Sequence, residues 1–598
     1  MKQYIKIILS PILILVLLFA NIGCKSELEE EFDNPNQYEP ELNNKISGLF
    51  TSQCSEWKVF VKDYGEWYWQ MSGFGVMSYI QVSGRYITPR YSFYESYEDL
   101  NSGNYLSDQG FTWFNDLYIK NRSWEKIQFF LSKASEDERA NSKIYYTLSS
   151  IIKDMCTLRC VDLYNSIPYS EAFQGNKGLF FPKYDDPKEI YTTVLKDLGA
   201  CYIRLEDEYK GMSAVAKQLF QKQDLIFSGD VSKWKKYTNA LRLRYAIHLS
   251  GVDQEFSVNI MKDVVKDLPN EDYYWDLPHV KPADELPGGG TWHRGMYERT
   301  YVSFVPNLIA NRLNFGSAKY EADIDDPRLP VLMMPTCFKD YRGVSMNADK
   351  QDQAYKDGHK YYPYGNDLAS SMDDTWDEKN KRYVGNTKSM WNFSTFMHNN
   401  LPVDIFTLAE VDLLLAEAEL KFQITGITVA DHLKNAVIHS TDFWYAMNGY
   451  SNYPEKFDDQ EVVDMMRPTK PSSGVIQQYA EMLAKAYRAK SDKADQIEMI
   501  MQQKFIHINL LRPYQLWTDL RRTCHPKLEP FTFDSKVMTP MPNRIKYPSS
   551  EFTSNTDNYM KVNKEDDFTS LIFWVSEEKK TEGYYRTEDI PFSQKPTF

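Results

Sequence analysis

Two stretches of the sequence concentrate aromatic side chains beside arginine, histidine and acidic residues, and such rings can bind a ligand through their faces and edges. They span about residues 62–114 and about residues 269–404. Tryptophan is highly buried on average, so packing in the core is the alternative for each single ring. Glycine, proline and polar neighbours favour exposure for the candidate ligand-binding residues Trp292, Trp275, Tyr274, His293, Tyr297, Arg85, Tyr91 and Tyr94.

Catalytic motifs are absent from the sequence. None of HExxH, GxSxG, GxxxxGK(S/T) or GxGxxG occurs, and the glycines 288–290 follow a proline and precede a tryptophan, as in a turn. The nine histidines do not have metal-ligand spacing, and the 83 acidic residues neither support nor exclude a glycosidase-type carboxylate pair. We therefore predict that the chain is not an enzyme and has no catalytic residues, metal ligands or cofactor, although a calcium ion is left open.

A cysteine, Cys24, ends the apolar segment that opens the chain. Two lysines precede an aliphatic block over residues 7–20, which is short for a bilayer span and has the composition of a secretory signal peptide. A retained membrane anchor is the alternative. The residues "ANIGC" resemble the lipobox of bacterial lipoproteins, in which cleavage frees the cysteine for lipidation. The resemblance implies a signal peptide at residues 1–23 and a lipid anchor at Cys24.

Acidic residues follow the cysteine at once. Residues 24–40 contain several glutamates, one aspartate and two prolines, and they have too little apolar surface to form a packed core. We expect a solvated tether there, and its acidic patch resembles a surface-export signal of such lipoproteins. A single domain is expected over residues 41–598.

Composition and charge limit the function classes. The 598 residues are 42% hydrophobic and 25% charged, as in an ordinary globular protein. The formal net charge of −14 and the lack of a basic run argue against a nucleic-acid partner. Besides Cys24, six cysteines are scattered without CxxC pairs, so no disulfide scaffold is expected. Cys156 and Cys160 lie one helical turn apart and are expected to be buried small residues.

Helical periodicity dominates the sequence from about Asn141 onward. The clearest helix is "TLAEVDLLLAEAELKFQ" at residues 407–423, whose apolar face comprises Leu408, Val411, Leu414, Leu415 and Ala418. Its glutamates, Glu410, Glu417 and Glu419, lie off that face. Further helices are predicted at about residues 142–164, 187–205, 232–249, 430–447, 474–489 and 496–511. The sequence does not place strands.

Consecutive helices of this length favour antiparallel hairpins that stack on one another, as in tetratricopeptide solenoids, although no 34-residue repeat is visible. Aromatic stretches as long as residues 62–114 and 269–404, without helical periodicity, are typical of functional loops. We predict a mainly α fold: a tetratricopeptide-like helical-hairpin scaffold with a large irregular, loop-rich ligand-binding portion and few short strands.

Five patches carry a family resemblance. They are "DLYNSIPYSEAF" (162–173), "DLIFSGDVSKWKKYTNALRLRYAIHLS" (224–250), "PVDIFTLAEVDLLLAEAEL" (402–420), "IMQQKFIHINLLRPYQLWTDLRRTCHP" (500–526) and "MPNRIKYPSSEFTSNTDNY" (541–559). In this order and spacing, together with "DDPRLP" at 325–330, they resemble the SusD/RagB family of nutrient-binding outer-membrane lipoproteins over most of the mature chain. Two turns depart from the pattern: Asn165 stands where the family often has glycine, and "LLRPYQ" lacks the glycine usual before the tryptophan helix.

The resemblance implies a function as well as a fold. A family member is anchored by lipid to the outer face of the outer membrane, captures glycans, and delivers them to a SusC-like TonB-dependent transporter, on which it closes as a lid. Sugar rings present flat C–H patches edged with hydroxyls, which suit aromatic faces and a few polar groups. The ligand residues are expected in the aromatic loops, but no motif transfers them one by one.

The motif residues themselves are expected to be structural. Arg521 and Arg522 are predicted to bridge carboxylates or cap carbonyls, and Asn239 to satisfy a backbone group of a loop. Three other functions stay open: capture of peptides or protein fragments by the same lid mechanism, a lipid-anchored hydrolase, and a tetratricopeptide scaffold that binds only protein partners.

Overall fold

A computed structural model gives the fold. It describes residues 42–55, 80–82, 113–274, 304–317, 319–336, 339–346, 361–362, 376–377, 382–384, 388–396, 398, 401–452, 454, 460–530, 532–533, 536–537 and 541–586. The predicted signal peptide and the tether at residues 24–40, with Cys24, lie outside these residues.

The first group of helices surrounds the long helix α8. α8 (Glu136–Tyr164) begins with a capping box, in which Ser135 accepts from the Glu138 backbone and the Glu138 carboxylate accepts from that of Ser135. α9 (Pro187–Lys210) packs between α8 and α11 (Val231–Leu249), and α11 packs on α12 (Gln254–Val264). The predicted helices at 142–164, 187–205 and 232–249 are confirmed.

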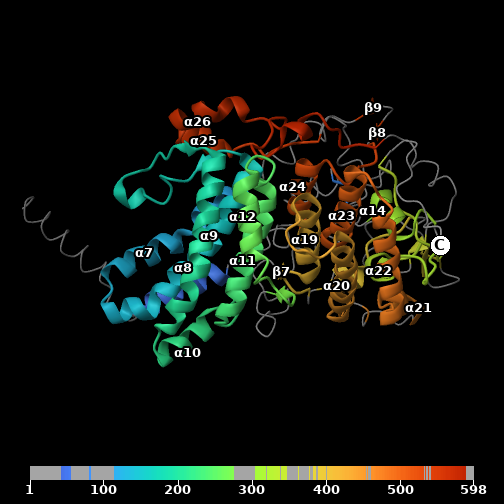
Figure 1. Cartoon of the computed structure of the whole chain (residues 1–598), viewed down its shortest axis with the longest axis horizontal. Coiled ribbons are helices and arrows are strands. Elements are labelled where there is room, and N and C mark those ends of the chain that lie inside the picture. The colour runs from blue at the N-terminus through green and yellow to red at the C-terminus, as the bar shows by residue number, and fades with distance from the viewer. Residues whose placement is uncertain are drawn as a thin grey trace, which may run out of the picture.

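The second group of helices comes from the C-terminal half and stands beside the first (Figure 1). α19 (Leu408–Phe422) forms a hairpin with α20 (Val429–Gly449), and α22 (Ser473–Arg488) and α23 (Lys493–Ile508) cover this pair. Hydroxyl or carboxylate side chains accept a backbone N–H at each of these starts, the N-caps being Thr407, Thr428, Ser472 and Asp492. The helices predicted at 407–423, 430–447, 474–489 and 496–511 are confirmed.

Shorter elements complete the described structure. The remaining described α-helices are α2 (Leu42–Ser55), α7 (Arg122–Lys133), α10 (Ala214–Gln223), α14 (Asn307–Leu313), α15 (Leu329–Leu332), α18 (Phe393–Phe396), α21 (Gln460–Met466), α24 (Pro513–Thr523), α25 (Ser549–Ser554) and α26 (Thr556–Val562). The strands are β1 (Ile167–Pro168), β2 (Tyr184–Asp185), β3 (Tyr273–Tyr274), β4 (Tyr361–Tyr362), β5 (Trp376–Asp377), β6 (Arg382–Val384), β7 (Asp404–Phe406), β8 (Thr532–Phe533) and β9 (Lys536–Val537). They pair antiparallel as β1–β2, β3–β7, β4–β6–β5 and β8–β9. The mainly α fold with few short strands is confirmed.

One large core runs through both helical groups. Its largest members are the fully buried tryptophans Trp234, Trp391, Trp444, Trp517 and Trp574. Cys156 and Cys160 are both buried, as predicted. Among the helices that the structure describes, none is both long and apolar enough to span a membrane.

The turn after α8 explains one departure from the family pattern. Asn165 has φ 70° and ψ −104°, a conformation that glycine adopts readily and other residues rarely. Its side chain compensates, since Oδ1 accepts a hydrogen bond of 2.8 Å from the backbone N–H of Phe573. Asn509, which directly precedes "LLRPYQ", also has positive φ, at 36°. Asparagine therefore replaces glycine where positive φ is needed.

Candidate functional site

Most candidate ligand-binding residues lie outside the part of the chain that the structure describes. These are Trp275, Trp292, His293, Tyr297, Arg85, Tyr91 and Tyr94. Tyr274 is described and lies at the end of β3, directly before the segment that holds the first four of them. The surroundings of Tyr274 therefore show what the fold places at the root of that segment.

Tyr274 lies on an aromatic floor. Its half-buried ring is nearly parallel to that of Phe443 of α20, with 6.3 Å between centroids and 4° between planes. Tyr450, at the C-terminal end of the same helix, is 42% exposed. A ring held in this way can take an apolar face of a ligand against it.

Two carboxylates stand beside the tyrosine. Tyr274 lies opposite Asp404 in the β3–β7 ribbon, and Asp272 accepts a 2.8 Å hydrogen bond from the backbone N–H of Leu408. Burial raises the pKa of Asp272 to about 6 in spite of that hydrogen bond. Burial and these two carboxylates together raise the pKa of Tyr274 well above its usual value. The root of the segment thus combines an aromatic face with one partly exposed carboxylate, Asp272, while Asp404 is buried.

Arg512 fixes the position of β7 relative to the helices. Arg512, the N-cap residue of α24, forms an ion pair with Asp404, in which Nη2 lies 3.1 Å from the carboxylate, and donates from Nη1 to Glu410 over 2.6 Å. Arg244 of α11 donates from Nε to the same Glu410 over 2.9 Å. Burial would raise the pKa of Glu410, but the two guanidinium groups outweigh it and lower the pKa to about 2. The carboxylate of Glu410 therefore joins α11, α19 and α24, and Arg512 links β7 to the same group of helices.

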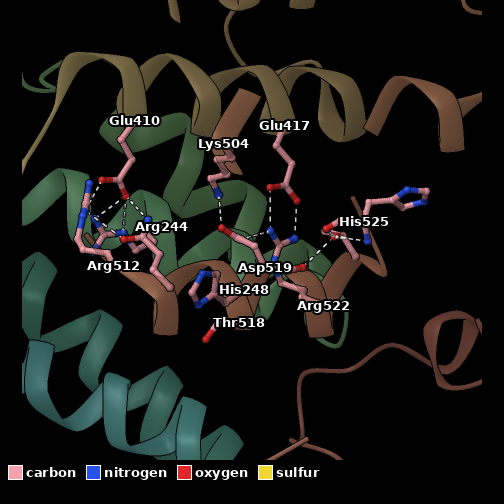
Figure 2. Close-up of polar contacts among 12 residues, drawn as sticks. Arg244, His248, Glu410, Glu417, Lys504, Arg512, Thr518, Asp519, Arg522 and His525 are labelled. Atoms are coloured by element: carbon pink, nitrogen blue, oxygen red, sulfur yellow. Dashed lines mark hydrogen bonds and ion pairs between the residues drawn. The ribbon is translucent and has the colours of Figure 1, made fainter. Parts of the chain in front are cut away.

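A second buried carboxylate continues the network along α19, as Figure 2 shows. Arg522 of α24 donates to Glu417 over 2.8 Å and to Asp519 over 2.8 Å. Lys504 of α23 donates to the other oxygen of Asp519 over 2.7 Å, and both side chains are fully buried. Charged groups this deeply buried are stable only when paired, so the network fixes how α19, α23 and α24 pack.

The sequence pattern placed Glu410 and Glu417 off the apolar face of their helix and gave no sign that both are fully buried. A signal was present in the motifs. Acidic residues of the third patch form ion pairs with arginines of the second and fourth patches. These arginines are Arg244, Arg512 and Arg522. The helix is surrounded on both sides, and periodicity cannot distinguish a buried, paired acid from a solvated one.

The predicted structural roles of the other motif residues are confirmed. Arg521 donates from Nη1 to the carbonyl oxygens of Asp162, over 2.9 Å, and Asn543, over 2.6 Å. Asn239 donates to the carbonyl oxygen of Asp267 over 3.0 Å. Asp230, the N-cap residue of α11, accepts a hydrogen bond from the backbone N–H of Lys233.

A small cavity lies between α8, α11 and α24. Its volume is about 60 Å³, and Asp162, Arg244, His248 and Thr518 are among the residues that line it. This is room for a few water molecules, not for a sugar ring. Within the described part of the chain, no three His, Cys, Asp or Glu side chains converge as metal ligands.

Comparisons with known proteins cover most of the chain. A family model described as starch-binding and associating with the outer membrane, SusD-like, matches residues 90–548. A solved chitin-binding protein is 20% identical, with a TM-score of 0.60 over 90% of this chain and 100% of its own. A SusD homolog from Bacteroides fragilis is 19% identical, with a TM-score of 0.60 over 89% and 100%. A SusD-like protein from Bacteroides thetaiotaomicron is 17% identical, with a TM-score of 0.57 over 91% and 100%. At these identities the structures show a shared fold.

Proposed function

The chain belongs to the SusD-like family, described as starch-binding and associating with the outer membrane, and from this membership we propose that it captures glycans at the cell surface without catalysing a reaction. The family match extends over residues 90–548, which include the whole of the second aromatic stretch, 269–404, and residues 90–114 of the first. We further propose that it is anchored through lipid on Cys24 at the extracellular face and delivers its ligand to a SusC-like TonB-dependent transporter.

One observation supports a glycan as the ligand. Tyr274 lies on Phe443 beside Asp272 and Asp404, at the root of the segment in which Trp275 and Trp292 occur. A sugar ring can lay its C–H face on an aromatic ring while a hydroxyl donates to a partly exposed carboxylate such as that of Asp272. Two or three such platforms with hydrogen bonds would give affinities of roughly millimolar to micromolar.

A binding panel tests this function. The mature chain with Cys24→Ser is run in affinity electrophoresis against host and plant glycans, with a peptide digest measured alongside by calorimetry. Retardation by a glycan supports the proposal. Binding of peptides without any glycan would replace the ligand class, and release of sugar products would show a hydrolase instead.

Copurification tests the transporter. A tagged chain is extracted from the outer membrane of its own bacterium, and the proteins that accompany it are identified. Recovery of a SusC-like transporter in stoichiometric amount supports the lid role. Its absence from gently solubilised membranes contradicts that role and leaves glycan binding to be judged separately.

A further inference from the structure

A loop between β1 and β2 presents unusually exposed hydrocarbon side chains. Leu179 is 41%, Phe180 70% and Phe181 67% exposed. In Figure 1 this loop projects outward on the side of the molecule where α7 lies. We name Leu179, Phe180 and Phe181 the apolar tip.

The backbone of the tip is held in place by hydrogen bonds. Leu179 donates to the Gln174 carbonyl over 3.2 Å, after Gly178 turns the chain with φ 83°. Two asparagines from the start and interior of α26 clamp the far side, Asn558 donating to the Phe181 carbonyl over 3.0 Å and Asn555 to that of Pro182 over 2.9 Å. The exposed rings are therefore presented by a fixed backbone.

An apolar groove adjoins the tip. It lies between α2 and α7, has a volume of about 680 Å³, and is lined by Leu49, Phe129 and Phe130 among others. Asn176, three residues before the tip, lines this groove and donates to Glu125 of α7 over 2.6 Å. Phe129 is 44% exposed. The tip and the groove form one face.

Lysines surround this hydrocarbon although the whole chain carries a net charge of −14. Lys177 and Lys183 are exposed on either side of the tip, and Lys126 lines the groove. Lys133 stands with Nζ 4.1 Å from the ring centre of Phe129. The carboxylates in the same region are engaged locally, Glu125 by Asn176 and Asp185 by Lys183 at 3.5 Å. Aromatic and aliphatic groups edged by lysine suit the boundary between acyl chains and anionic headgroups.

The start of the described chain lies at the same face. α2 begins at Leu42, about 18 positions after Cys24, and its residues Lys45 and Leu49 line the groove. A chain of that length spans at most about 60 Å when extended. A lipid on Cys24 would hold this face within that distance of the bilayer.

We propose that the apolar tip and the adjoining lysine-edged groove are a membrane contact that inserts into the outer leaflet of the outer membrane. Phenylalanine and leucine carry no polar group for sugar hydroxyls, and a projecting tip fits a fluid lipid layer without a preformed pocket. The contact depends on the outer-membrane association of the family and is independent of glycan binding. With a lipid anchor it gives two points of attachment, which fix the orientation of the protein on the membrane.

Vesicle sedimentation tests the contact. The mature chain with Cys24→Ser, which carries no lipid, is mixed with vesicles of phosphatidylethanolamine containing about one quarter phosphatidylglycerol. We expect the affinity for the vesicles to fall at least about tenfold to a hundredfold in Phe180→Ser/Phe181→Ser, since burying one phenylalanine already accounts for a factor of this size. The matched control Ile203→Ser/Val215→Ser removes side chains 71% and 76% exposed on α9 and α10 and should sediment as the parent does.

A charge-reversal arm checks the role of the lysines. Lys177→Glu/Lys183→Glu should weaken binding to the anionic vesicles and change binding to purely zwitterionic vesicles little. Glycan binding should be equal in all variants, which separates this proposal from the proposed function. The proposal is overturned if the parent does not sediment with vesicles, or if the tip variant and the control lose vesicle binding equally. It is also overturned if the tip variant still sediments with vesicles but no longer copurifies with the transporter, because the face would then bind protein.

Discussion

Nη1 of Arg512 lies 2.6 Å from Oε2 of Glu410, while Nη2 of the same arginine lies 3.1 Å from Oδ2 of Asp404. One guanidinium thus joins the start of α24 to the first turn of α19 and to β7. Because β7 pairs with β3, the pair also sets the position of Tyr274. The motif residues Arg512 and Glu410 thus support the candidate site through buried ion pairs.

Removing the arginine should cost much stability. Arg512→Ala leaves Glu410 and Asp404 with less compensation in the interior, and we expect the free energy of unfolding to fall by about 3–5 kcal/mol. Urea denaturation followed by circular dichroism measures the change. Arg488→Ala is the control, since that side chain is 53% exposed and 3.9 Å from Asp431, and it should cost less than about 1 kcal/mol. Equal losses in the two variants would show that the buried pair is unimportant.

Acid should weaken the network at Glu410. Its pKa in the folded protein is about 2, against an ordinary 4.5. Its contribution to the free energy of unfolding is therefore present above about pH 4.5 and is lost as the pH falls toward 2. A difference of this size corresponds to about 3 kcal/mol. Glu410→Gln should therefore show a shallower decline of the free energy of unfolding between pH 5 and 2 than the parent. Parallel pH profiles would contradict the low pKa.

Asp272 should act in the opposite direction. Its folded pKa of about 6 exceeds the ordinary 3.8, so the stability associated with its neutral form is full below about pH 3.8 and is lost as the pH rises through 6. Asp272→Asn keeps an acceptor for the Leu408 N–H and should raise the free energy of unfolding at pH 7 by about 1–3 kcal/mol. Thermal denaturation at pH 7 and pH 3.5 should show the gain only at pH 7. Asp442→Asn, at a carboxylate 52% exposed, should show no such difference.

The turn at Asn165 separates backbone strain from hydrogen bonding. Asn165→Ala loses both tolerance of φ 70° and the bond to the Phe573 N–H, and should destabilise by about 2–3 kcal/mol. Asn165→Gly loses only the bond and should cost about 1 kcal/mol. Chemical denaturation of both variants gives the order. If glycine is as harmful as alanine, the positive φ imposes no strain.

The sequence indicated the helices well because their apolar spacing and caps are local signals. Arg521 and Asn239 have the structural roles that their positions predicted. Glu410 was not recognised as buried, because its partners Arg244 and Arg512 lie 166 and 102 positions away. The aromatic neighbours of Tyr274 in the sequence indicate it as a candidate, but the ring that lies parallel to it, Phe443, belongs to a helix far along the chain. Contacts that depend on such distant pairing have no local pattern.

The most direct test of the central claim is calorimetric titration of the mature Cys24→Ser chain with the glycan that retards it in electrophoresis. Trp275→Ala and Trp292→Ala are compared with Phe552→Ala, which removes a ring 56% exposed on α25. We expect binding by the parent and the control, with an affinity about two- to tenfold lower in each tryptophan variant. Binding of peptides alone, or glycan binding unchanged in both tryptophan variants, would contradict the account.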